Sequence, residues 1–364
     1  MRSVRIALFS FGILVVASLA SQGVAYAKKQ RPAQESTLPA PLLTAMGHIG
    51  VFAERLTHST DRYQQPVFAE VERTTMAYAK KEAQTLRLDF YQPQGDTLTA
   101  RPIILYVHGG GFAGGTRDEE RYVQFAQRMA KRGYTVASIS YRLTMRGKSF
   151  GCDQPAANKI RTFQLAVEDI RSATKFLLSR HDELRIHTGQ IILAGSSAGA
   201  EAVLHAAYWK NKDLLAGSPV LPATFRYAGV ISMAGALVDL TLINQESAMP
   251  TLLYHGTCDG LVPFGAAPHH YCAPEDTGYL PLFGANAIAR RLHQLDRSYV
   301  LVADCGGRHE WNDKPLLRYY DQMSRAIYRL MLLRKKEQQT LIPEQTKTCT
   351  VSNYFNCEDI WQPK

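Results

Sequence analysis

Charged residues and cysteines are scarce in this sequence of 364 residues. Only 20% of the residues are charged, whereas 46% are hydrophobic and 10% are aromatic. A disordered chain is rich in charge and poor in aromatic residues, so a wholly disordered protein is excluded. The 6 Cys, 26 Gly and 17 Pro are ordinary numbers for this length, which excludes a collagen-like chain and a small disulfide framework. The composition indicates a globular protein with a large core.

The sequence also lacks a basic stretch interleaved with aromatic residues, the pattern typical of nucleic-acid binding. A net charge of +10 at pH 7 bears on solubility before it bears on partners. We therefore expect no nucleic-acid partner. Internal repeats and low-complexity segments are missing as well, which argues against a repeat protein.

The first 27 residues have the pattern of a signal peptide. Arg2 and Arg5 precede an apolar run at 6–19, and Ala25-Tyr26-Ala27 places small residues where a signal peptidase reads them. We expect cleavage after Ala27. A membrane anchor is the alternative, but the run is shorter than the ~20 residues that a span needs.

The expected mature chain begins at Lys28, and the loss of two arginines lowers the net charge from +10 to +8. No cysteine precedes Cys152, so a lipoprotein is not expected. We predict a periplasmic or secreted protein with no stable membrane span after signal cleavage. Six cysteines in an exported chain favour disulfides over metal sites.

Apolar periodicity divides the rest of the chain. Residues 28–65 read as an N-terminal arm or linker, with a short helix near 42–56. Further on, β-rich segments alternate with amphipathic helical ones. We expect strands at 86–91, 103–107, 135–139, 190–194, 228–233, 251–254 and 299–303, and helices at 124–132, 162–178, 198–209, 286–294 and 316–333. The alternation predicts an α/β fold with a mostly parallel central sheet and helices on both faces, in a catalytic domain at 66–335 followed by a tail at 336–364.

A glycine-serine motif, Gly195-Ser196-Ser197-Ala198-Gly199, separates one expected strand from the next helix. The pattern alone is weak, and an ordinary Gly/Ser-rich turn is the alternative. A sharp turn from strand to helix, however, exposes its central serine at the sheet edge within reach of a base. The N-terminus of the helix points at the same place. We therefore predict Ser197, and not Ser196, as a nucleophile.

A glycine-rich segment, His108-Gly109-Gly110-Gly111-Phe112, directly follows the expected strand at 103–107. Backbone N–H groups aimed at a substrate oxygen stabilise the charge of a tetrahedral intermediate, and glycines allow that close approach. A phosphate-binding loop is the alternative, but neither the Lys-Ser/Thr of a P-loop nor G-x-G-x-x-G spacing is present. His108 is expected to be structural.

Candidates for an acid and a base follow two later strands. Asp259 lies after the strand at 251–254, where a carboxylate could fix a histidine tautomer. A turn aspartate and Asp239, after the preceding strand, are its alternatives. His309 lies in a Gly-flanked loop after the last strand and is the candidate base. His269-His270 near Cys272 could suggest a metal, but no second ligand group has matching spacing. We expect no metal and no organic cofactor.

The order Ser197, Asp259, His309 is that of the α/β-hydrolase triad. Over about residues 84–335 the sequence resembles α/β-hydrolases of the esterase/lipase group with an HGGG-type loop. It is most similar to bacterial feruloyl- and acetyl-esterase-like (BD-FAE-like) enzymes. The resemblance implies the triad roles and, as oxyanion-hole donors, Gly110, Gly111 and Ala198. The family often has an acidic residue where this chain has Ser196.

Within this fold the segment at 234–250 is too short for a cap domain, so we expect no large cap. The two long loops, 142–159 and 264–283, would both lie beside the active site. The disulfides expected from this arrangement are Cys152–Cys272, Cys258–Cys305 and, in the tail, Cys349–Cys357. Free thiols or other pairings are the alternative. Candidate walls of the substrate pocket are Phe112, Tyr141, Met233 and Trp311, and each of these side chains could equally be core.

These observations predict an exported serine carboxylic-ester hydrolase (EC 3.1.1.-) that works through a Ser-His-Asp triad and an acyl-enzyme. The expected substrate is a small-molecule ester or an acyl group linked to a polysaccharide. A serine peptidase of the same fold, a polyester depolymerase and a non-catalytic binding protein are the alternatives. The sequence predicts no oligomeric state.

Overall fold

The computed structural model describes residues 61–343 and 355–363. The chain divides into two units, Met1–Ala53 and Glu54–Lys364, and the fold described below is that of the second. The expected signal peptide, the expected helix near 42–56 and most of the expected N-terminal arm lie outside the described residues. Within the described ranges, no helix is long and apolar enough to cross a membrane.

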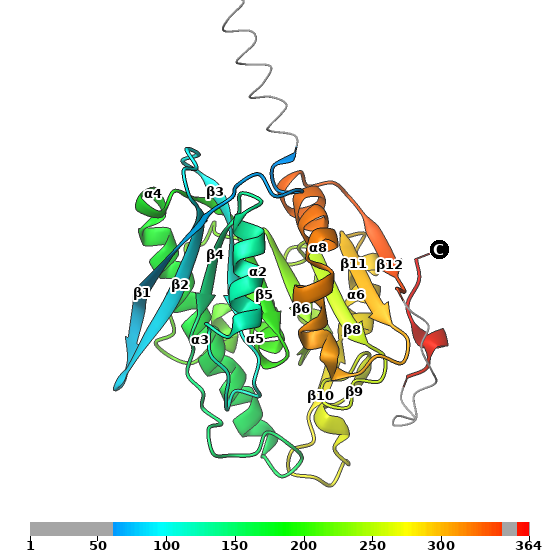
Figure 1. Cartoon of the computed structure of the whole chain (residues 1–364). Coiled ribbons are helices and arrows are strands. Elements are labelled where there is room, and N and C mark those ends of the chain that lie inside the picture. The colour runs from blue at the N-terminus through cyan, green and yellow to red at the C-terminus, as the bar shows by residue number, and fades with distance from the viewer. Residues whose placement is uncertain (1–60, 344–354, 364) are drawn as a thin grey trace, which may run out of the picture. The chain divides into compact units, whose positions relative to one another are not determined.

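A nine-stranded sheet forms the centre of this unit (Figure 1). Its order is β1-β2-β4-β3-β5-β6-β8-β11-β12. Strands β1 and β2 are antiparallel to each other, β2 is antiparallel to β4, and the other neighbours are parallel. The strands are β1 (Val71–Lys81), β2 (Gln84–Pro93), β3 (Arg101–Val107), β4 (Thr135–Ile139), β5 (Ile186–Ser196), β6 (Gly229–Met233), β8 (Thr251–Gly256), β11 (Tyr299–Asp304) and β12 (Gln338–Leu341). The prediction of a mostly parallel sheet is confirmed.

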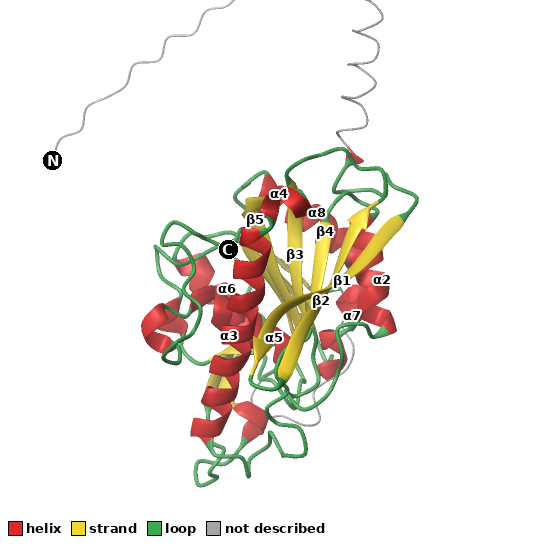
Figure 2. Ribbon diagram, turned by 90° about the vertical axis from the view of Figure 1, so that its left-hand side faces the viewer, coloured by secondary structure: helices red, strands yellow, loops and turns green. Residues whose placement is uncertain are grey.

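Helices cover both faces of the sheet, as Figure 2 shows from the side. One face carries α3 (Ala156–Ser179), α5 (Ala198–Tyr208) and α6 (Ala285–Gln294). The other carries α2 (Glu120–Ala130), α7 (Lys314–Arg318) and α8 (Tyr320–Ile327), which continues as a π-helical turn at Tyr328–Leu332. The short α4 (His181–Leu184) precedes β5. The arrangement of helices matches the sequence-based prediction.

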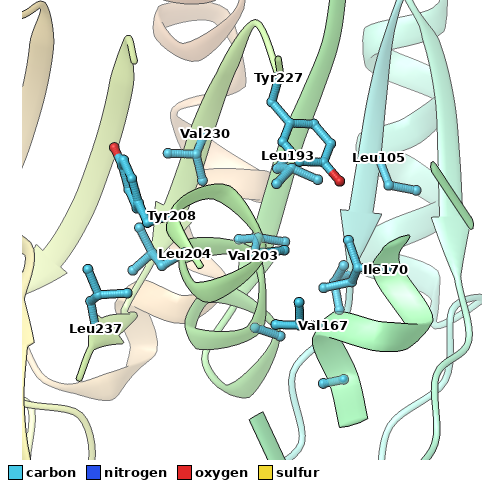
Figure 3. Packing of buried hydrophobic residues seen from close by; sticks show 14 of the residues in the cluster. Leu105, Val167, Ile170, Leu193, Val203, Leu204, Tyr208, Tyr227, Val230 and Leu237 are labelled. Atoms are coloured by element: carbon cyan, nitrogen blue, oxygen red, sulfur yellow. The ribbon is translucent and has the colours of Figure 1, made fainter. Parts of the chain in front are cut away.

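Strand β3 contributes side chains to both hydrophobic cores, one on each face of the sheet. Its side chains alternate, so Ile103, Leu105 and Val107 join the core under α3 and α5, while Ile104 and Tyr106 join the core under α2 and α8. Figure 3 shows the first core, where Val167 of α3 and Val203 of α5 meet side chains of the sheet. A strand buried on both faces is continuously apolar, which is why the sequence at 103–107 predicts a strand.

Two strands of the central sheet lie outside the predicted set because they are polar or exposed. Strand β1 is an edge strand in which Tyr78 alone is buried. Strand β12 has the sequence QQTL and is only half buried. It pairs in parallel with β11 and therefore extends the sheet into the segment that the sequence suggested was a separate tail.

The site-bearing end of the sheet carries two long loops. The segment between β6 and β8 contains only β7 (Ala236–Leu237) and a 3₁₀ turn at Leu240–Leu242, so there is no large cap there. The loop after β8 forms β9 (Ala266–Pro268), a 3₁₀ turn at His269–Tyr271 and β10 (Pro281–Gly284), which build a small sheet with β7. At the lower end of Figure 1 this loop meets the loop that follows β4.

The disulfides hold the loops and the tail in place. Cys152 is bonded to Cys272, with a Cα–Cα distance of 5.2 Å, and this is the expected pairing between the two long loops. Cys305 is bonded to Cys357, also with a Cα–Cα distance of 5.2 Å. The expected pairs Cys258–Cys305 and Cys349–Cys357 are therefore wrong. Cys258 is also disulfide-bonded, and Cys349 lies outside the described residues.

The tail packs against β11, which accounts for the pairing of Cys305 with Cys357. After β12 the chain returns along β11, where the indole N–H of Trp361 donates to the Tyr299 hydroxyl at 2.9 Å. The hydroxyl of Thr340 donates to the Trp361 carbonyl oxygen at 2.7 Å. This packing brings Cys357 beside Cys305 at the end of β11. Sequence spacing within the tail could not indicate it, because the contact depends on the unpredicted strand β12.

Candidate active site

Ser197 occupies a strained turn between β5 and α5. Its φ of 51° and ψ of −123° are unfavourable for a residue with a side chain. The flanking glycines make the turn sterically feasible: a Cβ on Gly199 would lie 2.2 Å from the Val107 carbonyl oxygen, and one on Gly195 would lie 2.3 Å from the Gly199 carbonyl oxygen. The turn thus has the geometry of a nucleophile elbow.

The three predicted triad residues meet at the carboxyl ends of β5, β8 and β11. Ser197 Oγ lies 2.8 Å from His309 Nε2. His309 Nδ1 lies 2.7 Å from Asp259 Oδ2. Asp259 follows β8 and His309 follows β11, and these two strands are parallel neighbours. The contacts form one continuous hydrogen-bonded chain from the hydroxyl to the carboxylate.

Asp259 is buried and firmly held. Its Oδ1 accepts hydrogen bonds from the N–H groups of Leu261 at 2.9 Å and Val262 at 3.0 Å. The second oxygen, Oδ2, lies 3.2 Å from His255 Nε2. Burial alone would raise the pKa of Asp259, but hydrogen bonds from His255 and His309 hold it well below its usual range. The carboxylate is therefore ionised at neutral pH and can only accept, which places a proton on His309 Nδ1.

The pKa of His309 is raised above its usual value. Burial by itself would lower it, but the hydrogen bond and the charge of Asp259 raise it, and the charge of Asp313 adds to the effect. Its Nε2 accepts from the Ser197 hydroxyl in the neutral form. The imidazole is therefore prepared to take a proton and to hold the resulting positive charge.

Asp239, the alternative acid, has a different role. Its carboxylate caps the 3₁₀ turn at Leu240–Leu242 by accepting from the backbone N–H of Thr241 at 2.8 Å. The Thr241 hydroxyl also donates to it at 2.8 Å. His309 meets Asp259 instead. The geometry therefore favours Asp259 over Asp239.

The glycine loop lies directly against the elbow. A Cβ on Gly109 would be 2.9 Å from the Ser196 carbonyl oxygen, and one on Gly110, whose φ is 114°, would be 2.3 Å from the Gly114 carbonyl oxygen. Gly111 also has a positive φ, 60°. Both Gly110 and Gly111 line the pocket with Ala198, whose N–H opens α5 and has no acceptor within that helix. The three predicted oxyanion donors thus surround one space.

His108, at the start of this loop, is structural as expected. Its Nδ1 lies 2.8 Å from the Gly109 carbonyl oxygen. Its own carbonyl oxygen accepts from the Tyr141 hydroxyl at 3.0 Å. Burial lowers the pKa of His108. The side chain is hydrogen-bonded to the backbone of the glycine loop and does not line the pocket.

A half-open pocket of about 350 Å³ lies over Ser197 and His309. Sequence reasoning missed several residues that line it, namely Arg121, Tyr122, Phe150, Glu201, Leu261 and His269. One of them had a signal in the sequence. Glu201 is four residues after Ser197, and positions i and i+4 share one face of a helix. The others come from loops and from α2, which no periodicity directs toward the site.

The four predicted pocket walls are core residues instead. Phe112, Tyr141, Met233 and Trp311 are all almost completely buried, and none lines the pocket. Phe112 packs behind Phe150, with ring centroids 5.1 Å apart. The Trp311 indole N–H donates to the buried Asp304 at 2.7 Å. Phe112 and Tyr141 belong to the core under α3 and α5, and Met233 and Trp311 belong to the core under α2 and α8. A position near a strand end therefore did not make them accessible.

The cysteines and histidines near the pocket are engaged in contacts other than metal binding. Cys152, Cys272 and Asp276 lie close enough to share an ion. The two cysteines, however, form a disulfide and offer no thiolate. His269 lies beside Glu201 instead of joining Cys272 in a ligand set, with 3.3 Å between its Nε2 and Glu201 Oε1. These residues therefore do not fit a metal site.

Part of the chain is similar in sequence to known esterases. Residues 88–248 match the model of the BD-FAE family. The chain is 28% identical to an acetyl esterase of Salmonella schwarzengrund over 173 residues, which are 47% of this chain and 43% of the relative. It is 32% identical to gut esterase 1 of Caenorhabditis elegans over 103 residues, 28% of this chain and 17% of the relative. The chain thus spans less than half the length of these curated relatives.

Solved structures are similar over a larger part of the chain. A thermophilic esterase of Thermogutta terrifontis with bound propionate has a TM-score of 0.52 and 18% sequence identity, covering 70% of this chain and 93% of its own. Its native form also has a TM-score of 0.52, at 19% identity, covering 72% of this chain and 92% of its own. At this identity the likeness concerns the fold. The solved structures thus show an α/β-hydrolase fold, within which residues 88–248 are similar to the BD-FAE family.

Proposed function

We propose that the protein is an exported serine carboxylic-ester hydrolase whose nucleophile, base and acid are Ser197, His309 and Asp259. One observation carries the proposal. The hydrogen-bonded chain from Ser197 Oγ through His309 to Asp259 begins at an elbow that opens into a pocket. A nucleophile, a base within hydrogen-bond reach and a group that orients the base are the requirements for acyl transfer.

The reaction follows from this arrangement. His309 Nε2 takes the hydroxyl proton while Ser197 Oγ forms a bond to the ester carbonyl carbon, whose oxygen becomes negatively charged. Collapse of this intermediate breaks the ester C–O bond, and the leaving alcohol takes the proton from His309. Water then gives a proton to His309 and attacks the acyl-enzyme. The acid leaves and Ser197 regains its proton.

Backbone N–H groups of Gly110, Gly111 and Ala198 are the proposed donors to the oxyanion. They line the pocket next to Ser197. A donor fixed in advance needs no reorganisation when charge develops, and loss of one such donor costs about 3 kcal/mol of transition-state stabilisation.

We infer small or carbohydrate-linked acyl esters as substrates. The pocket is half open, of about 350 Å³, and no large cap lies between β6 and β8. Similarity to an acetyl esterase of Salmonella supports a short acyl group. A structural neighbour with bound propionate is consistent with this size. Polyester cleavage would use the same chemistry, and a polymer therefore belongs in the test.

Export is part of the proposal. The sequence of residues 1–27 has the signal-peptide pattern described above. Two disulfides and a third bonded cysteine, Cys258, support an oxidising compartment, the periplasm or the exterior. Expression of the full chain with fractionation and N-terminal sequencing tests the point. A mature protein that begins at Lys28 outside the cytoplasm is expected.

The test of the activity is a graded panel of esters. It runs from short to long p-nitrophenyl acyl esters through acetylated xylan to a polyester film, with the matching p-nitroanilides as amides. We expect turnover of short acyl esters that Ser197→Ala abolishes. The matched control is Ser196→Ala, which is expected to stay active. The Ser196 hydroxyl forms a hydrogen bond of 2.7 Å with the Tyr106 hydroxyl and does not line the pocket.

Three results would contradict the proposal. Activity that survives in Ser197→Ala but not in Ser196→Ala would mean that the wrong serine is assigned. Faster turnover of amides than of esters would indicate a peptidase. Absence of turnover on every member of the panel would favour a binding role.

A further inference from the structure

Glu201 is a buried acid for which the proposed reaction has no use. It lies one helical turn after Ser197 on α5, and both residues line the pocket. The side chain of Glu201 is only 2% exposed. A carboxyl group is almost never buried without a partner, because losing its hydration is costly. Its position beside the nucleophile therefore calls for a functional explanation.

The neighbour of Glu201 on the pocket wall is His269. This residue comes from the loop after β9, and its side chain is 1% exposed. Its Nε2 lies 3.3 Å from Glu201 Oε1, but the geometry is not that of a hydrogen bond. Within the described part of the chain, neither Glu201 Oε1 nor His269 Nδ1 has a hydrogen-bond partner. The pair thus keeps donor and acceptor capacity that a molecule in the pocket can use.

The charge state of Glu201 follows from its surroundings. Burial raises its pKa to about 8, and the charge of Asp259 acts in the same direction. His309, Lys159 and His255 oppose the increase. At neutral pH the carboxyl group is therefore mostly protonated. In that form it can both donate and accept a hydrogen bond.

His269 is also uncharged. Burial lowers its pKa to about 3, and the nearby Lys159 adds to the effect. The Lys159 ammonium group itself is directed to the Gly278 carbonyl oxygen, to which it donates at 2.8 Å. Two neutral polar groups thus face a pocket whose neighbouring wall is apolar, with Phe150, Leu261 and Val262.

We propose that Glu201 and His269 form a polar subsite that binds a hydroxyl group carried by the substrate, close to the scissile ester. The inference rests on the proposed ester hydrolysis. A hydroxyl group donates one hydrogen bond and accepts others, so it can satisfy both members of the pair at once. A fixed cation on the substrate would require ionised Glu201, and a second carboxylate would be repelled by Asp259.

The hydroxyl group could belong to the acyl part or to the alcohol part, and matched substrate pairs distinguish the two. The acyl pair is p-nitrophenyl 3-hydroxybutyrate against p-nitrophenyl butyrate. The alcohol pair is 2-hydroxyethyl butyrate against propyl butyrate. For one of the pairs we expect kcat/KM to be about tenfold higher for the hydroxylated ester, the size of one good neutral hydrogen bond. The substrate pair that shows the preference identifies whether the hydroxyl group belongs to the acyl part or to the alcohol part.

Variants of Glu201 then test the assignment. Glu201→Leu should remove most of the preference, since the hydroxyl group keeps only His269 as a partner. Glu201→Gln should keep most of it, because an amide both donates and accepts. Glu246→Leu is the control, an exposed acid remote from the pocket, and its preference should equal that of the wild type. Circular dichroism and thermal melting establish that each variant is folded.

The outcomes separate this inference from the proposed function. Hydrolysis of plain and hydroxylated esters at equal rates by the wild type would overturn the subsite and leave the esterase intact. So would a preference that persists in folded Glu201→Leu, or a stronger preference for p-nitrophenyl 3-aminobutyrate at neutral pH. Absence of turnover on all esters would instead remove the proposed function itself. A variant that fails to fold is replaced by His269→Phe, which should also lose the preference.

Discussion

The hydrogen bond between His309 and Asp259 sets the protonation state on which the proposed reaction depends. Protonated His309 cannot take the Ser197 proton, so kcat/KM should fall as pH falls through the pKa of His309. That pKa is raised above its ordinary value of 6.5, against the effect of burial, by the bond and the charge of Asp259. The acidic limb of the pH profile is therefore expected above pH 6.5 in the wild type.

Removal of the charge should change both the rate and the profile. Asp259→Asn is expected to lower kcat/KM by about 10⁴, because the amide stabilises the wrong histidine tautomer. The acidic limb of the remaining activity should move to lower pH. Asp239→Asn, at a carboxylate that only caps a turn, is the matched control and should leave both unchanged. An unchanged limb in Asp259→Asn would contradict the assignment of the acid.

At the scale of elements, the loop between β3 and α2 supplies the proposed oxyanion donors. Gly110→Ala would place a Cβ 2.3 Å from the Gly114 carbonyl oxygen at a φ of 114°, so the loop must shift. We expect kcat to fall by about 10² to 10³ while KM changes little, because the donors act on the transition state. Gly114→Ala is the control in the same loop, since its Cβ would meet nothing within 4 Å. Equal activity of the two variants would argue against the loop's role.

Buried elements could be predicted from the sequence, and exposed ones could not. Strands such as β3 and β11 are apolar on both faces and therefore stand out as continuous runs. Strands β1 and β12 are mostly exposed or half buried, and their polar sequences resemble loops. The disulfide between Cys305 and Cys357 depends on β12 and was missed for the same reason.

The site itself shows the same division. Local chemistry pointed to Ser197, Asp259 and His309, because each follows a recognisable strand. The predicted pocket walls do not line the pocket, because the burial of Trp311 and Met233 depends on tertiary packing that no local sequence pattern contains. The i, i+4 spacing could have placed Glu201 on the same helix face as Ser197. Nothing else in the sequence around Glu201, however, indicated an acid in the site.

At the scale of the whole molecule, Glu201 links pH to stability. Its pKa in the folded protein is raised from 4.5 to about 8, so the folded state binds a proton that the unfolded state has already lost. Its contribution is thus fully present below pH 4.5, and the free energy of unfolding should fall as pH rises from there to 8. Glu201→Gln carries no titrating group and should lose this decline.

Chemical denaturation at about pH 5 and about pH 8 measures the effect. The stability gained by Glu201→Gln relative to the wild type should be larger at the higher pH than at the lower. Asp259 acts in the opposite direction, because its lowered pKa removes stability only in acid, and its contribution is constant across this range. A pH-independent difference between variant and wild type would show that Glu201 is ionised in the folded protein.

The measurement that tests the central claim most directly is covalent labelling of the nucleophile. The mature protein is treated with a fluorophosphonate, and the modified peptide is sequenced by tandem mass spectrometry. We predict one adduct per chain, on Ser197 and not on Ser196, with loss of ester hydrolysis in step with labelling. Failure to label, or an adduct on another residue with Ser197 unmodified, would contradict it.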